Sequence, residues 1–325
     1  MLPFPMPPPL ALARSADVLR PAGVLDPLWS AKWDGWRAVW GGGRLWGRRG
    51  TDLTRYLPDL VPVLAARLPA DVVVDGEVVA WDTDRGRLDF QGLSRRLTAG
   101  RRLAAAAAAR PAHLVCFDLL AAGGIDLRPR PLTERWARLE EILSGMAAPI
   151  VLCQQTDDED TALHWQQTLT VAGIEGLVIK AARNAYPNLA DQRVWHKLKV
   201  RETLELVCTS VAGDPAEPTL LLLSAPAGEG NLHAVGATGR LSRMAAREIG
   251  RLLEPTGETE RRYAGGPPGV SSARPLDAAV VEPLIVEVSV DVATDGGVLR
   301  HSARLLRARP DLTVNDLADA LDPSA

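Results

Sequence analysis

Lysine is the rare basic residue of this sequence. Of the 37 basic residues 33 are arginine, and the four lysines are Lys32, Lys180, Lys197 and Lys199. A lysine amine becomes a nucleophile when it loses its proton, whereas the arginine guanidinium stays protonated under ordinary conditions. Leftover surface lysines would be scattered, yet three of the four fall within twenty residues. The distribution therefore favours lysines that are kept for their chemistry.

The first lysine begins the segment Lys-Trp-Asp-Gly-Trp-Arg, which carries three kinds of charged group. Lys32 provides an amine, Asp34 a carboxylate and Arg37 a guanidinium. Gly35 lets the backbone bend closely around a bound group. Only about 0.1% of an ordinary lysine is neutral near pH 7.5, so an attacking lysine needs nearby cations that lower its pKa. Taken alone, the segment also fits a surface turn with a solvated Lys–Asp pair.

Lys197 and Lys199 alternate in the segment Trp-His-Lys-Leu-Lys. On a β-strand this spacing puts both amines on one face and directs them at one site. Together with Lys180 and a bound magnesium ion, they would disfavour protonation of Lys32 and stabilise charge on phosphate groups. An amphipathic edge strand without a chemical role is the alternative for this segment.

Other short motifs follow Lys32 along the chain. They are Gly47-Arg48-Arg49-Gly50, Asp75-Gly76-Glu77, Phe117-Asp118, Glu175-Gly176-Leu177-Val178-Ile179-Lys180, Trp195-His196-Lys197-Leu198-Lys199, Leu299-Arg300-His301 and Arg307-Ala308-Arg309-Pro310-Asp311. Their order and spacing resemble the ATP-dependent DNA ligases of the bacterial two-domain type, members of the covalent nucleotidyltransferase superfamily, over roughly residues 25 to 312. In that superfamily the lysine of K-x-D-G-x-R attacks the α-phosphate of a nucleotide. P-loop and G-x-S-x-G motifs are missing, which excludes P-loop NTPases and serine hydrolases.

The resemblance implies a role for each matching position. Lys32 would carry AMP, Glu77 would bind the ribose hydroxyls and Phe117 would stack on adenine. The nucleotide and its phosphates would be contacted by Arg37, Arg48, Lys180, Arg193, Lys197, Lys199 and Arg309. Glu175 and Asp34 would hold Mg²⁺ or Mn²⁺, since hard carboxylate oxygens suit these ions.

Three positions depart from the family pattern, the least of them Gly47, where the usual S-R-x-G motif has a serine. A glutamate commonly stands two residues before the nucleophile, and here that position is Ser30. A serine hydroxyl does not accept hydrogen bonds from the adenine amino group as a carboxylate does, which bears on base discrimination. The C-terminal R-x-D-K motif ends in Leu312. Arg307 is the candidate to replace the missing lysine in orienting the departing pyrophosphate.

The motifs are carried by elements that the apolar pattern predicts. Buried strands are expected at 71–81, 113–120, 149–154 and 176–180. Helices are expected over 159–169 and 101–110, and Thr133 is expected to cap a helix that runs to Leu143. After Lys199, short apolar runs at 204–211, 219–223, 232–235 and 280–290 predict a small all-β barrel with one helix over 241–253. The Gly/Pro-rich stretch 254–275 is interpreted as a long loop, and the proline-rich N-terminus as a polyproline-like arm. The fold class is therefore α+β, with a nucleotidyltransferase (adenylation) domain over 1–200 and an OB-fold domain over 201–325.

Composition and charge set further limits. Hydrophobic content of 46% and charged content of 24% are typical of a soluble globular protein, and no apolar run is long enough to span a membrane. Three separate cysteines in apolar runs predict buried thiols in a reducing cytoplasm. Residues 1–200 carry 25 basic and 22 acidic residues, a net charge of +3, whereas residues 201–325 carry 12 and 18, a net charge of −6. The second part is therefore not a generic basic grip on DNA.

The sequence predicts an ATP-dependent DNA ligase that seals 5′-phosphate/3′-hydroxyl nicks in double-stranded DNA through a lysine–AMP intermediate. An RNA ligase and an RNA-capping guanylyltransferase of the same superfamily are alternatives, as is a non-catalytic nucleic-acid-binding scaffold. The motifs at 75–77, 117–120 and 300–301 favour DNA, and retention of every lysine argues against a scaffold. A repair polymerase or an end-binding protein would be a separate partner chain.

Overall fold

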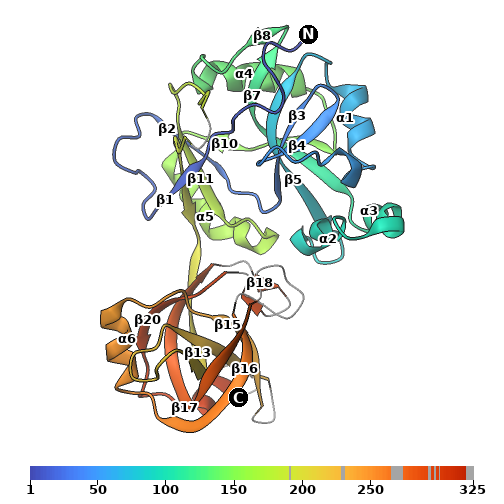
Figure 1. Ribbon diagram of the computed structural model, residues 1–325. Helices are drawn as coiled ribbons and strands as arrows, with labels where there is room; N and C mark the ends of the chain where they lie inside the picture. The colour runs from blue at the N-terminus through green and yellow to red at the C-terminus, as the bar shows by residue number, and fades with distance from the viewer. Residues whose placement is uncertain are drawn as a thin grey trace. The chain divides into compact units, whose positions relative to one another are not determined.

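The computed structural model describes residues 1–189, 192–227, 231–264, 274–291, 294–295, 298–299 and 301–319 (Figure 1). By its internal contacts the chain divides into two compact units, Met1–Val200 and Arg201–Ala325. Strands and helices occur in both units, so the predicted α+β class is confirmed. In the described part of the chain, no helix is long and apolar enough to cross a membrane.

The larger sheet of the first unit is built from valine- and leucine-rich strands. Its order is β4-β3-β5-β7-β8, with β6 paired to β5 and β9 paired to β7. The bounds are β3 Trp36–Gly41, β4 Arg44–Gly47, β5 Val73–Asp82, β6 Arg87–Leu88, β7 Ala112–Ala122, β8 Ile125–Asp126 and β9 Ile150–Leu152. The apolar runs at 71–81, 113–120 and 149–154 correspond to β5, β7 and β9, and their side chains enter the main hydrophobic core.

Helices pack around this sheet. They are η1 Thr54–Tyr56, α1 Val61–Arg67, α2 Phe90–Arg95, η2 Gly100–Arg102, α3 Leu103–Ala109 and α4 Leu132–Leu143. Helix α4 buries Trp136, Leu139 and Leu143, as its apolar spacing predicts. The expectation that Thr133 caps this helix is wrong. Pro131 is the N-cap, and the Thr133 N–H donates to the Ala182 carbonyl at 3.1 Å, so a tertiary contact rather than a local cap fixes the start of α4.

The smaller sheet of the first unit has the order β1-β12-β11-β2-β10. Its strands are β1 Ala13–Ala16, β2 Pro27–Ala31, β10 Gln155–Thr156, β11 Gly176–Ala181 and β12 Trp195–Lys199. Helix α5, Glu159–Thr168, and the following turn η3, Leu169–Ala172, come from the chain between β10 and β11. Trp29, Leu177 and Ile179 form a core cluster with Ala162 of α5. This cluster covers one face of the sheet. The residues that alternate with the cluster residues along each strand point to the other face.

The proline-rich N-terminus packs against the first unit, and the expectation of a polyproline-like arm is wrong. Leu10 and Ala11 are buried, and Leu2, Phe4 and Met6 lie against the main core. The prediction of an arm rests on the prolines and leaves out the apolar residues between them. Burying them removes apolar surface from water, which favours a packed segment over an extended one.

The second unit is organised by one long strand, β17, Arg274–Asp291. Strand β13, Arg201–Ala212, pairs with β17 along one edge, and β16, Pro255–Ala264, and β20, Arg304–Ala308, pair along the other. The sheet order is β15-β14-β13-β17-β16, so the predicted β-rich second part is confirmed. The remaining elements are β14 Leu220–Pro226, β15 Leu232–Ala237, α6 Arg243–Gly250, β18 Thr294–Asp295, β19 Val298–Leu299 and α7 Val314–Asp319.

The expectation of a long loop over 254–275 is also wrong. Residues 255–264 form β16, which pairs with the first part of β17, and residues 265–273 lie outside the described part of the chain. Most of the glycine and proline that suggested a loop falls in that second stretch. The first stretch reads Thr-Gly-Glu-Thr-Glu-Arg-Arg, and such a charged sequence is typical of a strand at the edge of a sheet.

Candidate active site

A cavity of about 380 Å³ lies between the two sheets of the first unit, a volume suited to a small ligand. Its walls come from the N-terminal segment, from β3, β5 and β7 of the larger sheet, and from β2, β11 and β12 of the smaller one. Eight of the residues that the sequence singled out line it together: Lys32, Arg37, Arg48, Glu77, Phe117, Lys180, Arg193 and Lys197.

Lys32 follows β2 directly and is held by the start of β11. Its N–H donates to the Gly176 carbonyl at 2.8 Å, and its own carbonyl accepts from the Glu175 N–H at 3.0 Å. A side chain at Gly176 would meet the Leu198 carbonyl at 2.1 Å, and its φ of +139° favours glycine. A glycine is therefore needed at this point, where β11 runs closely past β12.

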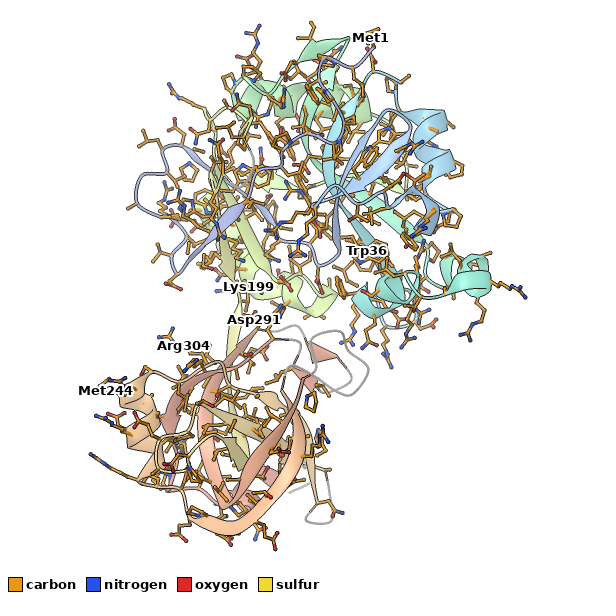
Figure 2. All side chains as sticks on the ribbon, in the orientation of Figure 1. Met1, Trp36, Lys199, Met244, Asp291 and Arg304 are labelled. Atoms are coloured by element: carbon orange, nitrogen blue, oxygen red, sulfur yellow. The ribbon has the colours of Figure 1, made fainter. Side chains whose placement is uncertain are left out.

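The Lys32 amine forms an ion pair with the Glu175 carboxylate. The same oxygen of Glu175 lies 3.7 Å from the amine of Lys199, which stands at the end of β12 (Figure 2). Glu175 is buried at 8% exposure of its side chain, whereas Lys32 is 21% exposed. Lys199 and Glu175 thus lie beside the nucleophile candidate, although neither is among the residues that line the cavity.

Lys197 faces the cavity from β12, and Lys199 follows it at the spacing of one strand face. Partial burial lowers the pKa of Lys197, and the charges of Lys199 and Lys32 lower it further. The cluster of amines that the sequence predicted is therefore present. A site that crowds cations in this way attracts phosphate groups.

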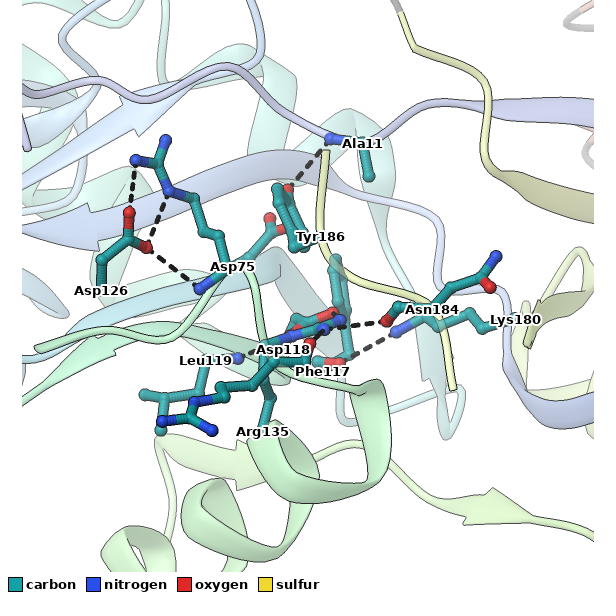
Figure 3. Close-up of polar contacts among 12 residues, drawn as sticks. Ala11, Asp75, Phe117, Asp118, Leu119, Asp126, Arg135, Lys180, Asn184 and Tyr186 are labelled. Carbon is teal, nitrogen blue, oxygen red and sulfur yellow. Dashed lines mark hydrogen bonds and ion pairs between the residues drawn. The ribbon is translucent and has the colours of Figure 1, made fainter. Parts of the chain in front are cut away.

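Lys180 is buried and lines the cavity, and Figure 3 shows its contact with Phe117. Its Nζ donates to the Phe117 carbonyl at 2.9 Å and lies 4.4 Å from the ring centroid of Trp195 and 4.8 Å from that of Phe117. Burial lowers its pKa. The amine thereby ties β11 to β7 across the two sheets and supports the two aromatic rings.

Arg37 is fixed against the same rings by a buried carboxylate. Its Nε and Nη2 donate to the two oxygens of Asp75 at 2.6 and 2.5 Å, and its guanidinium lies 4.6 Å from the Phe117 ring centroid. The Tyr186 hydroxyl donates to the same carboxylate at 2.6 Å and accepts from the Ala11 N–H at 3.0 Å (Figure 3). This network anchors the N-terminal segment at the cavity rim.

Glu77 lies opposite Arg37 across the β3–β5 pair, so both side chains point to one face. Burial raises the pKa of Glu77 to about 8, against the opposing charges of Arg37 and Lys32. The negative charge of Asp34 also raises the pKa of Glu77. Asp34 therefore lies close enough to Glu77 to act on it electrostatically. Burial thus favours the protonated form of the Glu77 carboxyl.

Phe117 lines the cavity and packs edge-on against Trp195, with ring centroids 6.0 Å apart. Trp195 in turn packs edge-on against Tyr186, at 5.8 Å. Trp195 belongs to a predicted motif but has no role predicted from the sequence, and Tyr186 and the N-terminal segment are not predicted to belong to the site at all. Trp195 stands next to the lysine pair in the sequence, and that position is the signal that could have identified it.

Arg309 belongs to the second unit and is not part of this cavity. It forms ion pairs with Asp311 at 2.8 Å and with Glu205. Arg300 lies outside the described residues. The side chains of Arg48 and Arg193 reach the cavity from exposed positions. Among the described residues no group of three or more His, Cys, Asp or Glu side chains is placed to hold a metal ion.

Comparisons with known proteins agree on one family. Residues 12–199 match the family described as ATP dependent DNA ligase domain. The chain is 31% identical to DNA ligase C2 of Mycolicibacterium smegmatis and 32% identical to DNA ligase C of Mycobacterium tuberculosis, in both cases over 95% of this chain and 92% of the relative. A solved structure of mycobacterial DNA ligase D complexed with ATP and MES is 25% identical, with a TM-score of 0.50, over 95% of this chain and 97% of that chain.

Proposed function

The chain belongs to the ATP-dependent DNA ligases, and from this premise we propose that its cavity binds ATP and that Lys32 is the residue that carries AMP. As a DNA ligase it acts on nicked DNA with ATP as co-substrate. The relatives are named DNA ligases, which favours DNA over the RNA ligase and guanylyltransferase alternatives. The observation that carries the proposal is the convergence of Lys32, Lys180 and Lys197 on one cavity.

The first step transfers AMP to the protein. Lys32 Nζ gives up a proton and attacks the α-phosphorus of ATP, a bond from nitrogen to phosphorus forms, and pyrophosphate leaves. The Lys32 amine is paired with the Glu175 carboxylate, so it must leave this pair before it attacks. Lys199 lies 3.7 Å from the same carboxylate and can retain it while Lys32 is released.

The later steps move AMP to DNA and then discharge it. An oxygen of the 5′-phosphate at the nick attacks the phosphorus, and the bond to Lys32 breaks. The 3′-hydroxyl then loses its proton and attacks the activated 5′-phosphate, which closes the strand and releases AMP. Lys197 and Lys199 would stabilise the phosphate charge in these steps, because fixed cations act where negative charge develops.

The remaining cavity residues would hold the nucleoside and phosphates. Glu77 is proposed to bind the ribose hydroxyls, and as a protonated carboxyl it can both donate and accept a hydrogen bond. Phe117 would stack on adenine. Arg37, Arg48, Lys180 and Arg193 would contact the nucleotide and its phosphates, and their shared lining of one cavity supports this assignment.

A divalent ion fits the donor chemistry of the site. Glu175 and Asp34 provide hard carboxylate oxygens, and Mg²⁺ or Mn²⁺ commonly uses one or two carboxylates together with substrate phosphates and water. When bound, such an ion would neutralise part of the charge on the phosphates. We propose this pair as the protein's contribution to the ion, with ATP supplying other ligands.

The two units are proposed to divide the work. The first, residues 1–200, would be the adenylation domain, because it contains the whole cavity. The second, residues 201–325, would be the OB-fold domain that carries the C-terminal motif with Arg309. Three buried free cysteines support a reducing cytoplasmic location. A repair polymerase or an end-binding protein remains the proposed partner.

Intact mass measurement tests the central proposal. The protein incubated with ATP and magnesium should gain the mass of one AMP group, and proteolytic mapping should place it on Lys32. Lys32→Arg keeps the positive charge but stays protonated, so it should give no adduct while melting at the wild-type temperature. A normal adduct yield in this variant would remove Lys32 from its role. An adduct from GTP and none from ATP would indicate a capping enzyme instead.

A further inference from the structure

One wall of the cavity is a row of residues that crosses the smaller sheet. Lys197 of β12 pairs with Val178 of β11, and Val178 pairs with Ser30 of β2. Ser30 pairs in turn with Gln155 of β10, which lies beside β2 (Figure 1). Residues directly opposite each other in a sheet point to the same face. The first three line the cavity, so Gln155 belongs to the cavity face, one strand beyond Ser30.

The Gln155 side chain carries an unsatisfied acceptor. Its Oε1 is buried, and among the described residues no group donates a hydrogen bond to it. Buried side-chain amide oxygens nearly always accept a hydrogen bond in folded proteins. Gln155 is not itself among the residues that line the cavity, so a turn of its side chain toward Ser30 would present this oxygen to a donor on the ligand.

Ser30 leaves space beside this acceptor. The ATP-dependent DNA ligases commonly have a glutamate at this position, and the Cβ atoms of directly paired residues are about 5 Å apart. The Ser30 hydroxyl is short, and it lies 3.5 Å from the Val178 carbonyl, which is a weak contact. A glutamine on the neighbouring strand can therefore reach the space that a glutamate would fill.

We propose that the Gln155 carboxamide recognises the adenine of ATP in this chain, in place of the glutamate of the family. The inference rests on the proposed function, because it requires that the base enters this cavity. The 6-amino group of adenine donates to Gln155 Oε1, and the carboxamide N–H donates to the adjacent ring nitrogen, a pairing that glutamine makes with adenine in nucleic acids. Guanine and hypoxanthine carry an oxygen at position 6, which would face a second acceptor.

The test compares ATP with purine riboside triphosphate, which has hydrogen in place of the 6-amino group. The rate of the lysine–nucleotide adduct is measured by intact mass at low nucleotide concentration for the wild type, Gln155→Leu and the more flexible Gln155→Met. Gln154→Leu is the matched control, since Gln154 is exposed and directly precedes the strand that carries Gln155. The wild type should prefer ATP, and both Gln155 variants should lose about ten-fold or more of that preference. Their rate with the purine analogue should fall less than their rate with ATP, because only the bond from the carboxamide N–H to the ring nitrogen is lost there.

The outcomes separate specificity from structure and from the proposed function. A preference for ATP that survives in both Gln155 variants would overturn the inference and leave the ligase assignment intact. Equal losses with both nucleotides in both variants would give Gln155 a structural role and also overturn it. A Gln154→Leu variant that lost the preference as strongly would show that the strand, and not the buried oxygen, matters. Failure of the wild type to form an adduct with either nucleotide would instead refute the proposed function.

Discussion

The carboxylate of Glu175 lies between the amines of Lys32 and Lys199. One of its oxygens forms the ion pair with Lys32 and stands 3.7 Å from the Lys199 Nζ. Backbone hydrogen bonds hold the three residues in place, since the Glu175 N–H donates to the Lys32 carbonyl and the Val200 N–H donates to the Glu175 carbonyl, each at 3.0 Å. One buried carboxylate thus serves two cations, and any group that draws it away from Lys32 frees the amine from its ion pair.

A first prediction follows for the metal requirement. If Glu175 contributes an oxygen to Mg²⁺, then Glu175→Gln replaces a charged ligand by a weak neutral one. The magnesium concentration that supports half-maximal adduct formation should rise about ten-fold or more. The measurement is adduct yield against magnesium at fixed ATP. Glu134→Gln, at an exposed position on α4, should leave the curve unchanged. An unshifted curve for Glu175→Gln would remove this residue from the metal site.

A second prediction concerns the stability of the first unit. Asp75 is fully buried and accepts hydrogen bonds from Arg37 and from Tyr186. Asp75→Asn removes the charge that compensates the guanidinium, and the first unit should lose about 2–3 kcal/mol of unfolding free energy. Denaturant unfolding, followed by the fluorescence of the tryptophans in this unit, measures the change.

An exposed pair provides the control for this effect. Arg138 and Glu141 form an ion pair on α4 with side chains that are 56% and 63% exposed. Glu141→Gln should change the unfolding free energy by less than about 0.5 kcal/mol, because exposed pairs are screened by water. Equal losses in the Asp75 and Glu141 variants would show that burial of the carboxylate does not strengthen the network.

A third prediction links the Glu77 carboxyl to pH. Burial raises its pKa from 4.5 to about 8, so the folded protein binds a proton here that the unfolded chain releases between these values. The stability that this proton contributes is fully present below about pH 4.5 and is lost as the pH rises through about 8. Wild-type stability should therefore fall, relative to Glu77→Gln, between pH 5 and pH 8.5. Thermal melting of both proteins measures this change. The melting temperature of the wild type minus that of Glu77→Gln should fall by roughly a few degrees over this pH range.

The control for the pH effect is an ordinary exposed carboxylate. Glu248→Gln on α6 changes such a group and should leave the pH dependence of melting as in the wild type. A constant difference in melting temperature between the wild type and Glu77→Gln across this pH range would mean that Glu77 titrates normally.

The sequence predicts those strands of the first unit that are rich in apolar residues, whereas it makes no prediction for β1 to β4. The patterns at 71–81 and 113–120 favour buried strands, and β5 and β7 are found there. The alternation of Lys197 and Lys199 likewise predicts one shared face. These inferences need only local information, since the period of side chains along a strand is fixed by backbone geometry.

Other features depend on contacts that local patterns do not encode. The proline-rich N-terminus reads as an extended arm, yet the Ala11 N–H donates to Tyr186 at the cavity. The position of Arg37 against Phe117 requires Asp75 from a neighbouring strand. Gln155 gains its place beside Ser30 only through strand pairing. In each case the partner is far away in sequence, so only the folded chain brings the groups together.

The last prediction concerns how the protein holds DNA. Residues 201–325 carry a net charge of −6, and the two arginines of the C-terminal motif are already paired, Arg307 with Glu287 and Arg309 with Asp311. Few phosphates should therefore be neutralised, and nick affinity should fall with salt at a slope that corresponds to about three to five contacts, each adding roughly −0.9 to the log–log slope.

Two variants locate the contacts. Arg304 is exposed on β20 (Figure 2), and Arg304→Ala should reduce the slope by about 0.9 if this side chain binds a phosphate, whereas Arg307→Ala should change it less because Glu287 already neutralises that charge. Titration of a nicked duplex from low to moderate salt, under conditions that prevent sealing, measures both. A wild-type slope that implies about eight or more contacts would show that a local basic surface outweighs the acidic character of this unit.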